Sequence, residues 1–205
     1  MYSEFLNFNT TYSTKIRDFN EWHKGIKYFG FWAIEITNSD CKDQIQIAQK
    51  HLTNRLHTHY SRQPHITLAT VGLLLDNSPQ NTLITDQIEK IKKSNIKSFP
   101  LQLSSFNSFS TCPYLNILDP LQKLNSIREC LNIKSDRSTP SKYTPHVTLG
   151  FYNDRYQTLD IVKDISKKSF DDIEFTVKEI VFARYKTKDV QGPYEVLHRI
   201  KLNDL

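Results

Sequence analysis

QPHITLA at residues 63–69 and TPHVTLG at residues 144–150 are two copies of one pattern, and this repeat decides the fold. In each copy a proline precedes a histidine, and a β-branched residue, a threonine, a leucine and a small residue follow. Internal repetition of this kind indicates an architecture of two related halves.

Both copies read as strands, and successive side chains of a strand point to opposite faces. The aliphatic residues between the polar ones would then face a core, while the histidine and threonine share the other face. We expect this shared face to carry His65, Thr67 and Ala69 in the first copy and His146, Thr148 and Gly150 in the second. Two such strands side by side would place two imidazoles and two hydroxyls around one cavity.

This set of groups suits the cleavage of a phosphodiester. A neutral histidine can take a proton from the attacking oxygen, and a protonated one can give a proton to the leaving oxygen, because the imidazole pKa is about 6.5. Threonine hydroxyls can hydrogen-bond the non-bridging oxygens as charge builds there. The catalytic residues predicted are therefore His65, Thr67, His146 and Thr148, with no metal or other cofactor. Which histidine is the acid stays open at this stage.

The same chain offers a control for the motif. A third His-x-Thr occurs at His51 and Thr53, but it lies in a predicted helix, where residues two apart point about 200° apart. His59 and Ser61 precede no apolar strand. Strand context and the preceding proline therefore select two copies only.

The hydrophobic pattern predicts a mixture of strands and helices. We expect strands at residues 28–37, 65–75, 99–109, 114–118, 146–152, 174–186 and 194–202. Apolar stripes predict four helices, at about residues 40–56, 84–91, 121–131 and 159–165. Asp40 would cap the first helix, and Asp119-Pro120 would open the third, with Leu121 on its buried stripe. The order indicates an α+β fold with largely antiparallel sheets and flanking helices.

Composition limits the class of protein. The chain has 205 residues and a formal net charge of +5, which favours an anionic partner such as a nucleotide or RNA. Its three cysteines are widely spaced, which favours a reducing compartment, and no apolar run is long enough for a membrane span. We predict a cytoplasmic monomer without membrane contact, with residues 1–27 as an N-terminal extension of a domain at 28–205.

Further candidates come from residue type alone. Arg184 and Lys186 alternate on a predicted strand and either line a phosphate-binding groove or form a solvated face. Three aromatic residues could stack a nucleobase or belong to the core: Tyr143, Phe151 and Tyr194. His57 and His59 lack the cysteine or acidic partners of a zinc site, so no metal site is predicted.

The paired P-H-[IV]-T-L motifs and the order of elements resemble the two-histidine (2H) phosphoesterase superfamily. The likeness is strongest to its RNA 2′,3′-cyclic phosphodiesterase and 2′-5′ RNA ligase-like branch, over residues 28–202. The resemblance implies a bilobal α+β fold of two pseudo-symmetric halves, with one His-x-Thr from each half in a central groove. It implies that the four motif residues named above are catalytic.

Three functions fit this resemblance. The first is a metal-independent phosphodiesterase that acts on an RNA end or nucleotide and opens a 2′,3′-cyclic phosphate to the 2′-phosphate. The second keeps the chemistry but hydrolyses 2′-5′ oligoadenylate or cyclic oligonucleotide signals. The third is a module that binds RNA ends or nucleotides without turnover, which two intact motifs argue against.

Overall fold

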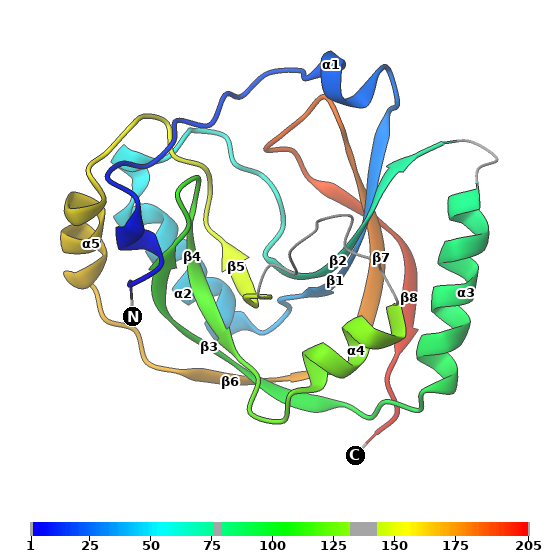
Figure 1. Ribbon diagram of the computed structural model, residues 1–205. Coiled ribbons are helices and arrows are strands. Elements are labelled where there is room, and N and C mark those ends of the chain that lie inside the picture. Colours follow the sequence, from blue (N-terminus) through cyan, green and yellow to red (C-terminus); the bar gives the residue numbers. More distant parts are fainter. Residues whose placement is uncertain (1, 76–78, 132–142, 205) are drawn as a thin grey trace.

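The computed structural model describes residues 2–75, 79–131 and 143–204, which form two four-stranded sheets with helices around them (Figure 1). The first sheet has the order β2-β1-β7-β8 and contains β1 (Tyr28–Glu35), β2 (His65–Leu74), β7 (Glu179–Lys186) and β8 (Tyr194–Lys201). The second has the order β5-β4-β3-β6 and contains β3 (Phe99–Ser108), β4 (Pro113–Leu118), β5 (His146–Thr148) and β6 (Ile173–Val177). All neighbouring strands are antiparallel. The predicted α+β fold with two related lobes is confirmed.

The two sheets repeat each other in one respect that positions the site. Each motif strand, β2 or β5, lies at the edge of its sheet and pairs with one inner strand, β1 or β4. The backbone after each motif proline is held in the same way. Ile36 N donates to Pro64 O at 3.0 Å, and Ile117 N donates to Pro145 O at 3.1 Å. The repeat in the sequence is thus a repeat in the structure.

The helices pack around these sheets. They are α1 (Asn20–His23), α2 (Ser39–His51), α3 (Pro79–Lys93), α4 (Lys123–Leu131) and α5 (Thr158–Ser166), with the 3₁₀ turns η1 (Phe5–Asn7) and η2 (Thr53–Arg55). None of these helices is long and apolar enough to cross a membrane.

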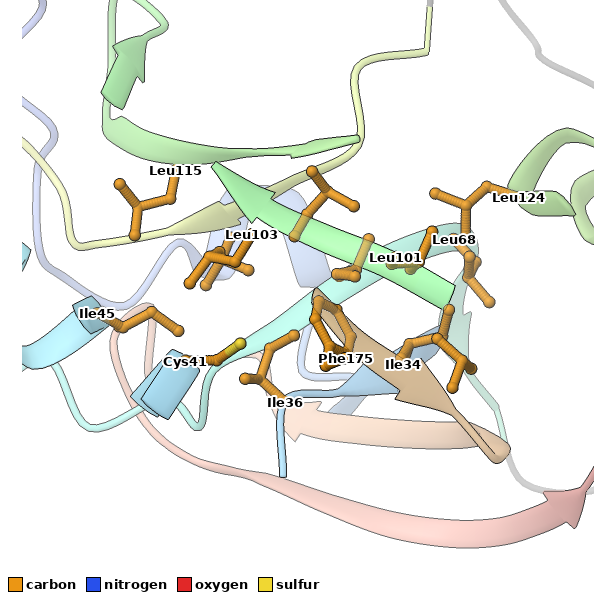
Figure 2. Close-up of a cluster of buried hydrophobic side chains, with 14 of the residues drawn as sticks. Ile34, Ile36, Cys41, Ile45, Leu68, Leu101, Leu103, Leu115, Leu124 and Phe175 are labelled. Atoms are coloured by element: carbon orange, nitrogen blue, oxygen red, sulfur yellow. The ribbon is translucent and has the colours of Figure 1, made fainter. Parts of the chain in front are cut away.

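Most of the buried apolar side chains form one cluster between the sheets and the helices (Figure 2). Ile34 of β1, Leu68 of β2 and Leu101 of β3 are each no more than 2% exposed in it. Figure 2 shows these together with side chains from other strands and helices, among them Ile36, Cys41, Ile45, Leu103, Leu115, Leu124 and Phe175. The aliphatic residues of both motifs, Ile66, Leu68, Val147 and Leu149, belong to this cluster.

Several predicted boundaries differ from the structure. Residues 174–186 do not form one strand, because the chain leaves β6 at Lys178 and enters β7 in the other sheet. Lys178 and Glu179 interrupt the alternation of apolar residues at this crossing, but such a short break is equally compatible with a bulge in one continuous strand. The strand predicted at 146–152 ends at Thr148, and the helix predicted from residue 40 to 56 ends at His51.

The starts of α2 and α4 also differ from the prediction. The cap of α2 is Asn38, whose Oδ1 accepts from Cys41 N at 2.9 Å, while Asp40 lies in the first turn. Asp119 does accept hydrogen bonds from Lys123 N and Leu124 N, but α4 begins only at Lys123. Leu121 therefore precedes the helix and is 54% exposed, because it has no helical face to bury.

The N-terminal segment packs onto both lobes. Phe5 is buried in the main core, and Thr11 N donates to Tyr156 O at 2.9 Å. Further along, Trp22 of α1 packs on Phe29 of β1, with ring centroids 5.6 Å apart. Figure 1 shows this segment in blue, crossing from η1 beside the second sheet to α1 beside the first. Its assignment as an extension that ends at residue 27 stays a prediction.

Candidate active site

His65 stands at the first position of β2, opposite Glu35 of β1. Its Nδ1 lies 2.8 Å from the carbonyl oxygen of Gln63. A carbonyl oxygen only accepts, so Nδ1 carries the hydrogen in this bond. In the neutral ring, Nε2 is therefore the nitrogen with the free lone pair, the form that a general base requires.

His146 has the same arrangement at the first position of β5. Its Nδ1 lies 2.7 Å from the carbonyl oxygen of Thr144, so this ring is also held with its hydrogen on Nδ1. In both motifs the acceptor is the residue two positions before the histidine. The local backbone of each Pro-His turn thus sets both the tautomer and the direction of the ring.

Each imidazole packs against a pair of aromatic rings that also contact each other. For His65 these are Phe31 at 5.3 Å and Tyr194 at 5.2 Å between centroids. For His146 they are Phe109 at 5.0 Å and Tyr114 at 5.1 Å. Each aromatic pair covers part of its imidazole and keeps water away from that part.

Burial among these rings favours the neutral imidazoles. It lowers the pKa of His65 to about 4, with the Arg62 charge and His146 acting in the same direction. Burial also lowers the pKa of His146.

The threonines follow the alternation expected of a strand. Thr67 lies opposite Ala33 of β1, and Thr148 opposite Tyr114 of β4, and both are partly buried. Burial raises the pKa of the neighbouring Cys112 thiol to about 11, and Thr148 acts in the opposite direction. The face that carries the histidines and threonines of β2 and β5 is called the groove below.

The small residues after the threonines do not both lie where alternation predicts. A register shift between Trp32 and Ala33 places Ala69 opposite Trp32, on the side of the main core. The expectation that Ala69 shares the face of His65 is therefore wrong, and exposed Thr70 takes the next place along the groove. Gly150 lies after the end of β5, with φ of 149°, and a Cβ there would meet Leu56 at 3.2 Å.

Direct contacts join the two motif strands, which are neighbours in the structure. The hydroxyl of Tyr143 donates to the carbonyl oxygen of Thr67 at 3.0 Å. Arg128 of α4 lies 3.8 Å from the ring centroid of Tyr143 and donates to the carbonyl oxygen of Leu68. The segment that leads into the second motif is thus fastened to the first motif.

Tyr194 of β8 is held from both ends beside His65. The side-chain amide of Gln63 bridges its backbone, donating to Tyr194 O and accepting from Tyr194 N, each at 3.0 Å. At the other end, its hydroxyl donates to Glu35 Oε1 at 3.0 Å, and Glu35 also pairs with Arg199. These hydrogen bonds fix the position of the Tyr194 ring that contacts His65.

The other predicted binding residues lie in different places. Along β7, Val181 and Ala183 face the groove, so Arg184 and Lys186 do not lie with the histidines. Arg184 pairs with Glu195 and lies over Tyr28, while Lys186 lines a separate cavity beside α1. Phe151 packs edge-on against Tyr60, 5.8 Å between centroids.

Four further residues shape the site and were not predicted from the sequence. They are Glu35, Arg62, Gln63 and Arg128. Arg62 lies 4.1 Å from the ring centroid of Tyr185. Its positive charge contributes to the lowered pKa of His65. Arg62 and Gln63 stand next to the first motif, so their position in the sequence could have indicated that they belong to the site. Glu35 and Arg128 are far from the motifs in sequence and reach them only through folding, so nothing in the sequence indicated their role.

Among the described residues, no group of three or more histidine, cysteine or acidic side chains is arranged to hold a metal ion. His57 is instead engaged with the backbone, its Nε2 2.7 Å from the carbonyl oxygen of Thr14.

Two antiparallel lobes, each presenting a histidine and a threonine from an edge strand, define the class of two-histidine phosphoesterases. The chain belongs to the 2′-5′ RNA ligase superfamily, whose family model matches residues 39–189, a stretch that contains both motifs. Comparison with curated proteins gives no match.

Solved structures share the fold at low sequence identity. Escherichia coli LigT in complex with NADP+ has a TM-score of 0.56 at 17% identity, with 87% of this chain and 99% of LigT covered. TT0787 of Thermus thermophilus has a TM-score of 0.58 at 13% identity, with 86% and 98% covered. Usb1 of Kluyveromyces marxianus has a TM-score of 0.51 at 15% identity, with 85% and 98% covered.

Proposed function

We propose that this protein is a metal-independent phosphodiesterase that acts on an RNA end or nucleotide and opens a 2′,3′-cyclic phosphate to the 2′-phosphate. The observation that carries the proposal is that the imidazoles of His65 and His146 are held by the same kind of hydrogen bond. Each gives its Nδ1–H to a carbonyl of its own turn, so each has Nε2 available for proton transfer. Two such nitrogens supply the one acid and one base that hydrolysis needs.

In this mechanism His65 is the general base. Burial and the neighbouring Arg62 charge hold its pKa at about 4, so it is neutral at pH 7 and ready to accept a proton at Nε2. It takes a proton from the water that attacks phosphorus. The bond from phosphorus to the 3′ oxygen breaks, and His146 in its protonated form gives a proton to that oxygen. The product carries a 2′-phosphate and a free 3′ hydroxyl.

The threonines serve the non-bridging oxygens of the phosphate. Thr67 and Thr148 stand two residues beyond the histidines on the same strand faces. Hydroxyl donors fixed in a partly buried site stabilise the charge that builds on those oxygens in the transition state. An anionic phosphate in the groove also favours a protonated imidazole, which provides the charged form of His146 that the acid step requires.

Two further observations support a nucleotide or RNA substrate. The formal net charge of +5 attracts polyanions. Structures of Escherichia coli LigT, which shares the fold, contain 3′-AMP in one case and phosphate in another. These ligands are a nucleotide and the group on which the proposed reaction acts.

The test is turnover in the presence of EDTA. RNA ending in a 2′,3′-cyclic phosphate, nucleoside 2′,3′-cyclic phosphates and 2′-5′ oligoadenylate are each incubated with the protein, and the products are separated chromatographically. We expect 2′-phosphate products from the cyclic phosphates, with rates unchanged by EDTA. Loss of activity with EDTA would contradict the metal-free mechanism. Cleavage of 2′-5′ oligoadenylate alone would replace the proposed substrate, and binding without turnover of any substrate would contradict an enzyme.

A further inference from the structure

A cavity of about 470 Å³ lies beside His146, with the N-terminal segment as one of its walls. Tyr114 and Phe109, whose rings contact His146, line this cavity, and so does Thr144, which accepts the His146 Nδ1 hydrogen. Three of the lining residues therefore contact the proposed acid directly. Its volume falls in the range of about 300–1,000 Å³ that is usual for small-molecule sites.

The wall formed by the N-terminal segment is firmly held. Phe5 is 2% exposed in the main core, and Thr158 of α5 donates its hydroxyl to Phe8 O at 2.8 Å. Tyr12 N donates to Ser110 O at 2.7 Å, close to the opposite wall. Chain termini are usually poorly ordered unless they are tied down in this way. Residues 3–8 lie outside residues 39–189, the stretch that matches the family model.

The lining combines aromatic faces with polar groups. Phe8 and Phe109 contribute rings, and Phe8 is 43% exposed although it is large and apolar. Asn116 contributes an amide whose Nδ2 donates to Ser105 O at 3.0 Å, which fixes its orientation. Aromatic rings with a few placed polar groups are the usual lining of a site for a planar heterocycle, because a base stacks on the rings and its edge is hydrogen-bonded.

Glu4 brings a carboxylate to this lining. It precedes η1, but its side chain makes no capping hydrogen bond there, and it lines the cavity. Its charge reaches Tyr114, because burial and then the Glu4 carboxylate raise the pKa of that tyrosine to about 12. A carboxylate repels phosphate and accepts N–H donors, so it suits a base edge that carries an amino group.

We infer that this cavity binds the nucleobase of the substrate, stacked on Phe8 and Phe109 and with an amino-bearing edge toward Glu4, while the phosphate lies at the histidines. This inference rests on the proposed function, because it supplies the base subsite of the same groove. It makes the N-terminal segment a determinant of base preference.

The test is a binding measurement that needs no turnover. Calorimetry is performed on the full chain with guanosine 3′-monophosphate, inosine 3′-monophosphate, which lacks only the 2-amino group, and inorganic phosphate. The variants are Phe8→Ala and Glu4→Gln. Leu6→Ala is the matched control, because Leu6 is 42% exposed in the same turn and does not line the cavity. Circular dichroism of each variant checks that the fold is kept.

We expect Phe8→Ala to weaken guanosine 3′-monophosphate binding roughly fivefold or more, since stacking on one aromatic ring contributes on that scale. Phosphate binding should be equal in the wild type, Phe8→Ala and Leu6→Ala. The guanosine ligand should bind at least about threefold more tightly than the inosine ligand, and Glu4→Gln should remove this preference. Nucleotide binding that is the same in the wild type, Phe8→Ala and Leu6→Ala would overturn the inference. Absence of turnover with these binding results intact would instead contradict the proposed function.

Discussion

The hydroxyl of Tyr143 donates a hydrogen bond of 3.0 Å to the main-chain carbonyl of Thr67, and this bond joins the approach to the second motif to the middle of the first. The two imidazoles stand on edge strands of different sheets, so their separation depends on such cross-connections. Arg128 strengthens the connection, because it lies over the Tyr143 ring and donates to the backbone of β2.

Removing this bond should loosen the pair of motifs. Tyr143→Phe keeps the ring under Arg128 but leaves the Thr67 carbonyl without that donor. We expect a loss of about 1 kcal/mol in the free energy of unfolding and a lower kcat with little change in KM. Denaturant unfolding and steady-state kinetics measure both effects. Tyr156→Phe serves as a control, because it removes a tyrosine hydroxyl that bonds Asn153 away from the motifs. Equal kinetics in the two variants would contradict the role given to Tyr143.

The two motif histidines should differ sharply from the third His-x-Thr of the chain. We expect His65→Ala and His146→Ala each to lower kcat by roughly 10²–10⁴-fold, the usual contribution of general acid–base catalysis. His51→Ala is the matched control, since His51 lies on α2 with its ring nitrogen bonded to the Asp164 carbonyl. Turnover of a nucleoside 2′,3′-cyclic phosphate is measured for all three. Near-wild-type rates in either motif variant would show that the site has been assigned wrongly.

The sequence predicted the motif geometry well where local rules apply. Alternation along a strand placed Ile66 and Val147 in the core, and the structure has both fully buried. The rule failed at Ala69, because the register shift between β1 and β2 arises from pairing with another strand and leaves no mark on the motif itself. Similarly, nothing in the sequence around Glu35 connects it with Tyr194, since their contact spans most of the chain.

Arg184 shows a different limit of sequence reasoning. Its position on a strand was predicted correctly, but the face to which it points depends on which side of the sheet the core covers. Both faces of β7 carry apolar residues, with Phe182 in the main core and Ala183 on the groove side, so alternation alone could not decide between them.

For catalysis, the hydroxyl groups of Thr67 and Thr148 should matter more than the shape of the two side chains. Thr67→Val and Thr148→Val keep the volume of the side chain and remove the donor, and we expect each to lower kcat roughly 10²-fold. Thr67→Ser and Thr148→Ser retain a hydroxyl and should recover most of the rate. Single-turnover kinetics with saturating enzyme separate this effect from substrate binding. Serine variants as slow as the valine variants would point to a packing role instead.

Tyr194 should act on His65 through its ring rather than its hydroxyl. Tyr194→Phe keeps the edge contact of 5.2 Å and leaves Glu35 paired with Arg199. We expect it to cost about 1 kcal/mol of stability with kcat nearly unchanged. Tyr194→Leu removes the ring and should lower kcat at least tenfold, because the imidazole loses one of the two rings against which it packs. If the two variants had the same kcat, the ring contact would have no part in placing His65.

The stability of the protein should fall in mildly acidic solution because of the motif histidines. Burial lowers the pKa of His65 to about 4, whereas the unfolded chain titrates near 6.5. Between these values the unfolded state binds more protons than the folded state, so the free energy of unfolding decreases as the pH falls from about 6.5 toward 4. His146 contributes in the same direction. Urea unfolding at pH 7, 5.5 and 4.5 should show a loss of roughly 1–3 kcal/mol that is smaller in His65→Gln, which cannot take up the proton. Parallel losses in the wild type and the variant would mean that His65 is not held neutral by the fold.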